Sequence, residues 1–288
     1  MKTKYTVKDF NADYQTDADA LAFIFKMRYP NGATCKCGKK DCWHPVKNRR
    51  VYECAWCGYQ ISPTAGTIFH KSSTSLKSWL FAMFLISNSK NGVSAMELQR
   101  QLGVTYKTAW RMNHQIRKLM QSGGGKMSGI VEADETYIGG VRRGGKRGRG
   151  SENKTPVIGV LERGGNVQAK VAANVKTVTV MPNILANVEK GATVCTDELW
   201  SYNPLTKAGY KHQRVGHAAR EYVRGNVHTN SIEGFWSQLK RSINGTFHHV
   251  SRQHLQKYVN EFVYRYNLRG TESPIFADLS AKVADLHA

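Results

Sequence analysis

The sequence predicts an α/β chain in which a small cysteine-rich module and a helical region precede a mixed sheet flanked by helices. Three observations lead to this prediction. Five of the six cysteines lie between residues 35 and 57. Helical periodicity dominates residues 76–119, and after residue 128 short β-rich apolar runs alternate with helical patterns. At 288 residues and 41% hydrophobic content, the chain can bury a sizeable core and is long enough for two domains.

The formal net charge of +21 is large, and both halves of the chain are basic. A polyanion is the natural partner of such a chain, and nucleic acid is the commonest one; a basic protein without that role is the alternative. The chain has no run of roughly 18 apolar residues, so no membrane span is expected. Its N-terminus lacks the apolar region of a signal peptide, which predicts a cytoplasmic protein with access to the nucleoid of a bacterium.

The first segment, residues 1–70, is expected to hold a helix and a metal-binding module. Thr16 is a credible N-cap for a helix over residues 16–28, because Asp19 follows three residues later. Further on, C-x-x-C-G at Cys54 lets two thiolates converge on one metal. The predicted structural zinc ligands are Cys35, Cys37, Cys54 and Cys57, with Cys42 or His44 as alternates to Cys35. A reduced, metal-free cysteine cluster is the other interpretation.

Residues 71–127 are expected to form a helix-turn-helix region that binds DNA. Helical patterns cover residues 76–87 and 94–102, Gly103 makes a turn, and a third helix starts at Thr105. An ordinary helical hairpin in a core is the alternative. The side chains expected on or near the exposed face of the third helix are Tyr106, Lys107, Arg111 and Arg117. A glycine-rich linker at residues 121–126 then leads to the last domain, residues 128–288.

This last domain predicts a sheet and its covering helices. Strands are expected at residues 130–133, 156–161, 167–173 and 192–196, with a helix at 177–189 before the last strand. Two further helices are expected at residues 228–243 and 253–266. This order suits a ribonuclease-H-like fold. Between the first two strands, a glycine-rich basic stretch should contact phosphates, unless it is only a solvated hairpin tip. Its cationic candidates are Arg142, Arg143, Lys146, Arg147 and Arg149.

Three carboxylates are the candidate catalytic residues. Asp134 and Asp197 each follow a short apolar run, and Glu233 lies on a narrow polar stripe of the helix at 228–243. We interpret them as one metal site, against the alternative of three unrelated surface acids. Two Mg²⁺ (or Mn²⁺) ions about 3.5–4 Å apart would offset the mutual repulsion of these acids. Strand alternation is expected to turn Glu135 away from Asp134. The DNA-contacting candidates near Glu233 are Lys240, Arg241, Asn230 and His228.

With these residues, the chain resembles bacterial insertion-sequence transposases of the DDE class with an N-terminal zinc ribbon. In words, this is the fifteen-ninety-five family, in its ISXO-two-like group. The resemblance covers nearly the whole chain. Its blocks include R-Y-P-N-G-A-T-C, L-G-V-x-Y-K-T-A-W-R-M, D-E-T-Y-I-G-G, T-D-E and H-T-N-S-I-E-G-F-W-S-Q-L-K-R. By position the acidic triad falls on Asp134, Asp197 and Glu233, with the family's trailing lysine at Lys240; some relatives have Asn as the third residue, which makes Asn230 the alternative. The shortened first cysteine pair departs from the pattern.

The resemblance implies an enzyme that acts on double-stranded DNA. Such a transposase would bind terminal inverted repeats, cleave to free 3′-hydroxyls and join them to target DNA. Because two ends must be synapsed, a homodimer or a larger assembly is expected. A nuclease or resolvase of the same fold, or a domesticated DNA-binding regulator, are the alternatives.

Overall fold

A computed structural model of the chain describes residues 5–121, 123–139, 154–215, 227–271 and 275–285. The chain divides into two compact units, one made of residues 1–119 and 271–288 and the other of residues 120–270. No helix in these described ranges combines the length and the apolar character that crossing a bilayer needs.

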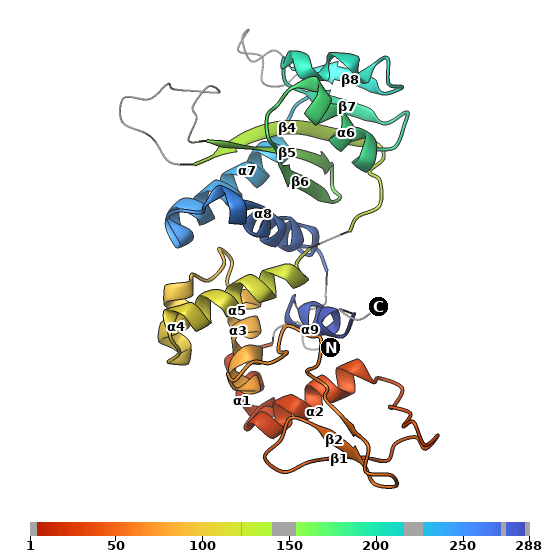
Figure 1. The fold of residues 1–288 in the computed structure, drawn as a ribbon. Helices are drawn as coiled ribbons and strands as arrows, with labels where there is room; N and C mark the ends of the chain where they lie inside the picture. Colours follow the sequence, from red (N-terminus) through yellow and green to blue (C-terminus); the bar gives the residue numbers. More distant parts are fainter. Residues whose placement is uncertain (1–4, 122, 140–153, 216–226, 272–274, 286–288) are drawn as a thin grey trace. The chain divides into compact units, whose positions relative to one another are not determined.

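The first unit is mainly helical (Figure 1). Its helices are α1 (Val7–Asp13), α2 (Asp17–Arg28), α3 (Leu76–Asn88), α4 (Ala95–Leu102), α5 (Tyr106–Leu119) and α9 (Ile275–Asp285). Helix α9 packs against α2 and α3. By packing, therefore, the end of the chain belongs with this unit, whereas the sequence grouped it with the sheet. The expected domain boundaries at residues 70 and 127 separate the zinc-binding, DNA-binding and catalytic regions, and they stay a prediction.

Local sequence signals explain how these helices start and turn. The Thr16 hydroxyl accepts a hydrogen bond from the backbone N–H of Asp19, and the Asp19 carboxylate accepts one from Thr16 N–H, so the predicted capping box is present. Between α4 and α5, Gly103 adopts a φ of 64°, a left-handed conformation that glycine takes without strain. The chain thereby folds back into the predicted pair of helices.

A small antiparallel sheet also belongs to the first unit. It consists of β1 (Trp43–Pro45), β2 (Tyr52–Cys54) and β3 (Gln60–Ile61), in the order β1-β2-β3. The register places Trp43 opposite Cys54, so the sheet carries one of the cysteine pairs at its end. These short strands give the cysteine-rich module its scaffold.

The second unit is built on a five-stranded mixed sheet, with strand order β6-β5-β4-β7-β8. Its strands are β4 (Ile130–Ile138), β5 (Thr155–Glu162), β6 (Val167–Val171), β7 (Thr193–Thr196) and β8 (Lys211–Arg214). Strands β4, β5 and β6 pair antiparallel, whereas β4 pairs parallel with β7 and β7 with β8. Strand β4 continues beyond its expected end at residue 133, and β8 was not expected.

Helices cover both faces of this sheet (Figure 1). Helix α6 (Thr177–Asn187) packs on one face, over a core that includes Val131, Val160 and Ile184. Helices α7 (Asn230–Ser242) and α8 (Arg252–Asn267) pack on the other, over a core that includes Val157 and Trp236. The predicted mixed sheet flanked by helices is therefore confirmed, and it is consistent with a ribonuclease-H-like fold.

Candidate active site

Asp134 and Asp197 meet where strands β4 and β7 part. The parallel pairing of these strands runs up to Ala133 and Thr196, so each aspartate is the next residue beyond the last pair. Carboxylate oxygens of Asp134, Glu135 and Asp197 lie within 4.8 Å of one another. The Asp197 carboxylate also accepts a 2.9 Å hydrogen bond from the backbone N–H of Leu199. The structure thus brings together two of the three predicted carboxylates.

Glu233 lies in the first turn of α7, the helix that packs against β4 and β5. One of its carboxylate oxygens accepts a 2.8 Å hydrogen bond from the Thr229 hydroxyl. One turn later, the indole N–H of Trp236 donates to Asp134 over 3.1 Å. Within the described ranges, Glu233 is not part of the group of oxygens within 4.8 Å. It lies close enough, however, for its charge to act on Asp134.

The aspartate at the centre of this site carries an unusual proton affinity. The pKa of Asp134 is raised from 3.8 to about 7, first by burial and then by the negative charges of Glu135, Asp197 and, more weakly, Glu233. Such a cluster favours a bound cation, because a positive charge offsets both the burial and the repulsion. All its donors are carboxylate oxygens, the ligands that hard divalent ions prefer. These residues therefore fit Mg²⁺ or Mn²⁺.

Glu135 was expected to turn away from Asp134, yet one of its oxygens lies within 4.8 Å of carboxylate oxygens of both aspartates. Its side chain does start toward the other face of the sheet, where Tyr202 donates a 3.3 Å hydrogen bond to it. However, β4 runs on to Ile138 while β7 ends at Thr196, so β7 does not continue alongside the part of β4 that carries Glu135. A long glutamate side chain can then approach both aspartates. The adjacent acid in D-E-T was the signal available in the sequence.

Several predicted DNA-contacting residues lie on α7 or just before it. Asn230, Lys240 and Arg241 are exposed, as contact with a phosphate requires. The side chain of His228 is 23% exposed, and its Nδ1 lies 3.2 Å from a carboxylate oxygen of Glu132. Contact of these residues with DNA stays a prediction.

The predicted DNA-binding face of the helix-turn-helix is only partly exposed. Tyr106, Lys107 and Arg111 are exposed on α5. Trp110 is exposed as well, and its ring packs at a tilt against the buried His114, with ring centroids 3.9 Å apart. Arg117, by contrast, is only 1% exposed. Its expected exposure was wrong, because it lies one turn from the buried Asn113 and follows the buried Ile116 on the inner face of α5. Arg142, Arg143, Lys146, Arg147 and Arg149 lie outside the described residues.

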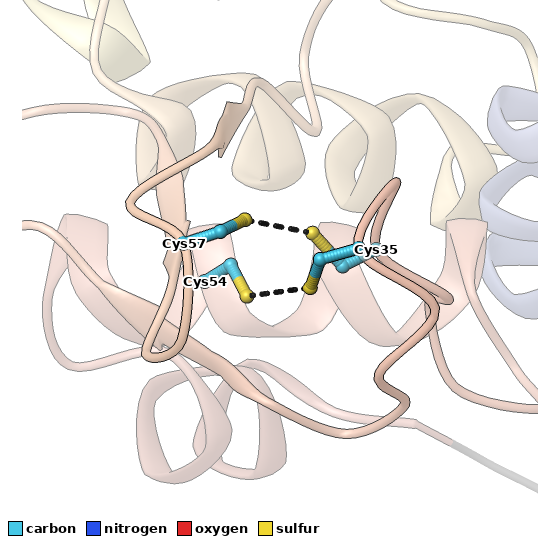
Figure 2. A group of neighbouring side chains, drawn as sticks. Cys35, Cys54 and Cys57 are labelled. Carbon is cyan, nitrogen blue, oxygen red and sulfur yellow. Dashed lines mark hydrogen bonds between the residues drawn. The ribbon is translucent and has the colours of Figure 1, made fainter.

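The four predicted zinc ligands form one cluster in the first unit. Sulfur atoms of Cys35, Cys37, Cys54 and Cys57 all lie within 4.8 Å of one another, and Figure 2 shows Cys54 and Cys57 directed toward the loop that carries Cys35. Four thiols at this spacing fit a tetrahedral structural zinc ion. Of the two alternative zinc ligands, Cys42 has its sulfur 3.2 Å from the sulfur of Cys54. The other, His44, has its Nε2 3.8 Å from a carboxylate oxygen of Glu53.

Comparison with known proteins gives matches to two transposase domains. Residues 126–267 match the ISXO2-like transposase domain, and residues 15–60 match the transposase zinc-ribbon domain. An uncharacterized protein in transposable element ISH50 of Halobacterium salinarum is 26% identical over 271 residues, which cover 88% of this chain and 91% of that protein. An uncharacterized transposase-like protein of Haemophilus influenzae is 28% identical over 109 residues, 38% of this chain and 87% of that protein.

Proposed function

The chain belongs to the family of ISXO2-like transposases, and we propose that it binds the terminal inverted repeats of its element, cleaves to free 3′-hydroxyls and joins them to target DNA. The observation that carries this proposal is the meeting of Asp134 and Asp197 where β7 ends beside the central strand β4, on the sheet that packs against the helix bearing Glu233. Carboxylates gathered in this way suit phosphoryl transfer, which depends on positioning and charge stabilisation.

Each proposed catalytic carboxylate is oriented by a specific donor. The Trp236 indole holds Asp134, the Leu199 backbone N–H holds Asp197, and the Thr229 hydroxyl holds Glu233. We propose these three carboxylates as the ligands of Mg²⁺ or Mn²⁺. When bound, such ions activate the attacking oxygen and stabilise the leaving oxygen. The protein holds these carboxylates in fixed orientations by hydrogen bonds, so the metal ligands are positioned before the substrate binds.

DNA binding is assigned to two basic regions and supported by their exposure. On α5 the exposed Tyr106, Lys107 and Arg111 form the proposed recognition surface. On α7 the exposed Lys240 and Arg241 follow Glu233 by about two helical turns, and we propose that they contact phosphates flanking the scissile one. The cysteine cluster would hold zinc in a structural role, since four protein ligands leave no open position for chemistry.

The reaction also predicts an assembly of more than one chain. Joining two ends of an element requires both ends in one complex, so we propose a homodimer or a larger synaptic complex on DNA. The nucleophile is first water and then a DNA 3′-hydroxyl, so a covalent protein–DNA intermediate is not required.

The experiment is a strand-joining assay with purified protein. It combines Mg²⁺, an end-labelled duplex carrying the terminal repeat of the host element, and a supercoiled target plasmid. Asp134→Asn, Asp197→Asn and Glu233→Gln are each expected to lower joining by more than about 100-fold, the upper end of losses seen when only the partners of metal ligands are changed. Glu198→Gln is the matched control, because Glu198 is an exposed acid next to Asp197 that lies outside the carboxylate cluster.

The outcomes separate the proposal from its alternatives. Joined products that depend on all three carboxylates support a transposase. Cleavage without joining under any condition indicates a nuclease of the same fold. Tight binding of the repeat with no cleavage in any divalent metal would leave a DNA-binding regulator and overturn the catalytic proposal.

A further inference from the structure

A fully buried glutamate, Glu132, lies on β4 two residues before Asp134. Residues two apart on a strand point to the same face, and here that face is the one covered by α7. The side chain of Glu132 is 0% exposed. A carboxylate in such a place is costly to bury unless it is paired and hydrogen-bonded.

Glu132 is paired on both of its oxygens. One oxygen accepts a 2.7 Å hydrogen bond from Arg163 Nε and lies 3.2 Å from His228 Nδ1. The other accepts a 3.0 Å hydrogen bond from the backbone N–H of Ile232. Arg163 also donates from Nη2 to the backbone carbonyl of His228 over 2.9 Å. The group therefore connects β4, the loop after β5 and the chain just before α7.

The bond to Ile232 replaces the usual cap of α7. The first N–H groups of a helix have no partner within the helix, and a nearby side-chain oxygen normally accepts from them. Thr229 is the N-cap residue of α7, but its side chain makes no capping bond, because its hydroxyl is directed to Glu233. Glu132 supplies the missing acceptor from another strand, and its negative charge suits the positive end of the helix dipole.

We propose that Glu132, Arg163 and His228 form a positioning clamp that fixes the start of α7 on β4 and thereby sets Glu233 against Asp134. Glu233 is the residue directly after Ile232, so any slip or rotation of α7 at this bond moves the third carboxylate. Trp236 ties the same helix to Asp134 one turn further on. The inference rests on the proposed function only in giving Glu233 its role as a metal ligand.

A directional clamp also explains why an ion pair is placed here. Buried ion pairs contribute little net stability compared with apolar packing, but their hydrogen bonds fix direction, which apolar contacts do not. Carboxylates that bind metals must be held closely to their working geometry. The clamp acts through Glu233, so its three members are positioning residues.

The test uses Glu132→Gln, which keeps an oxygen for Ile232 N–H and removes the charge that holds Arg163. The matched control is Glu261→Gln. Glu261 is also 0% exposed and also pairs with an arginine, Arg265, at 2.8 Å, but both lie within α8. Both variants lose a buried ion pair of the same type, so a general loss of stability affects both. Arg163→Lys is the second variant, since lysine keeps the charge but has one compact ammonium in place of the rigid fork whose Nε and Nη2 reach Glu132 and the His228 carbonyl separately.

The first readout is structural and needs neither metal nor DNA. In a ¹H–¹⁵N spectrum, the indole signal of Trp236 reports its hydrogen bond to Asp134. We expect this signal to shift in Glu132→Gln and Arg163→Lys and to keep its position in Glu261→Gln. An unchanged Trp236 signal in both clamp variants, or equal shifts in all three, would overturn the proposal.

The second readout is the concentration of Mg²⁺ that half-saturates DNA cleavage. Changes in the partners of metal ligands typically cost about 10- to 100-fold in metal affinity or activity. We expect a rise of that order for Glu132→Gln, with the dissociation constant for the terminal repeat within about twofold of the parent protein. If the half-saturating Mg²⁺ concentration rises equally in Glu132→Gln and Glu261→Gln, the clamp is contradicted. If the parent protein does not cleave DNA at all, the proposed function fails, whereas the Trp236 signal still decides the clamp.

Discussion

At the residue scale, one glycine makes room for the contact between α7 and the sheet. Gly159 on β5 lies opposite Asp134 in the register. A Cβ atom at this position would come within 2.6 Å of the Trp236 ring, which is closer than carbon atoms can approach. The absence of a side chain therefore lets the indole lie flat enough on the sheet to reach Asp134.

Gly159→Ala is expected to push Trp236 off the sheet. Overpacking a core in this way typically costs about 1–3 kcal/mol of unfolding free energy, which denaturant unfolding measures. The Trp236 indole signal should shift in the same variant. Gly123→Ala is the control, because a Cβ there has open space around it. A Gly159→Ala protein with parent stability and an unchanged indole signal would show that the close approach is not needed.

The raised pKa of Asp134 predicts how the stability of the metal-free protein depends on pH. In the folded chain this pKa is about 7, against 3.8 for an ordinary aspartate. The folded state therefore binds more protons than the unfolded state between these values, and the free energy of unfolding falls as pH rises from about 4 to about 7. The loss is on the order of 4 kcal/mol, at about 1.4 kcal/mol for each of about three pKa units.

This pH dependence is measured as the difference between the parent protein and Asp134→Asn. The asparagine variant should lack this part of the slope, and added Mg²⁺ should stabilise the parent more at pH 8 than at pH 5. Equal slopes in the two proteins would mean that Asp134 ionises normally.

At the element scale, two amide side chains of α8 complete the edge strand β6. Asn267 accepts from Val167 N–H and donates to the carbonyl of the same residue, over 2.8 and 3.0 Å. Gln256 accepts from Val171 N–H over 2.7 Å and donates to the Ala169 carbonyl over 3.2 Å. Edge strands are prone to pair with other chains, and these amides occupy the groups that such pairing would use.

Gln256→Leu is expected to leave two backbone groups of β6 without their partner. The cost of such groups is about 1–3 kcal/mol, and the open edge should increase aggregation. Thermal unfolding and light scattering measure the two effects. Gln253→Leu adds the same apolar side chain at an exposed position of the same helix and is the control. Equal aggregation of both variants would attribute it to surface hydrophobicity alone.

The sequence predicted most of the elements in which apolar residues follow a clear pattern, but it missed helices α1 and α9 and strand β8. Helices α2, α4 and α5 and strands β5 and β6 lie where the pattern indicates; α4 and α5 bury one regular face, and β5 is an apolar run buried on both faces of the sheet. Strand β8, K-H-Q-R, has no apolar alternation and is added at the sheet edge by its parallel pairing with β7. Glu135 and Arg117 could not be placed, because their positions depend on where a neighbouring strand ends and which helix face is covered. Tertiary contacts decide both.

At the scale of the whole molecule, the two proposed metal sites belong to different units. The cysteine cluster lies in the unit that contains residues 1–119, and the carboxylates lie in the unit of residues 120–270. A structural zinc site contributes directly to folding of its own module. Removing zinc should therefore unfold the ribbon and leave the carboxylate site folded.

Limited proteolysis after treatment with a zinc chelator checks this separation. New cuts are expected within residues 30–62, while a fragment covering residues 120–270 persists. Cys54→Ser should lose the zinc and show the same cuts. Cys195→Ser is the control, because this cysteine is buried in the second unit and lies outside the cluster. Zinc content unaffected by Cys54→Ser would mean that the cluster does not bind the metal.

We propose that Asp134, Asp197 and Glu233 form one site for divalent metal, and iron-mediated cleavage of the protein backbone tests this site. Fe²⁺ bound in place of Mg²⁺ generates hydroxyl radicals with ascorbate and peroxide, and these cut the chain next to the ion. A single metal site predicts cuts near residues 134, 197 and 233 together, all suppressed by excess Mg²⁺ and all absent in Asp134→Asn. Cuts near 134 and 197 but not near 233, or none that Mg²⁺ suppresses, would contradict it.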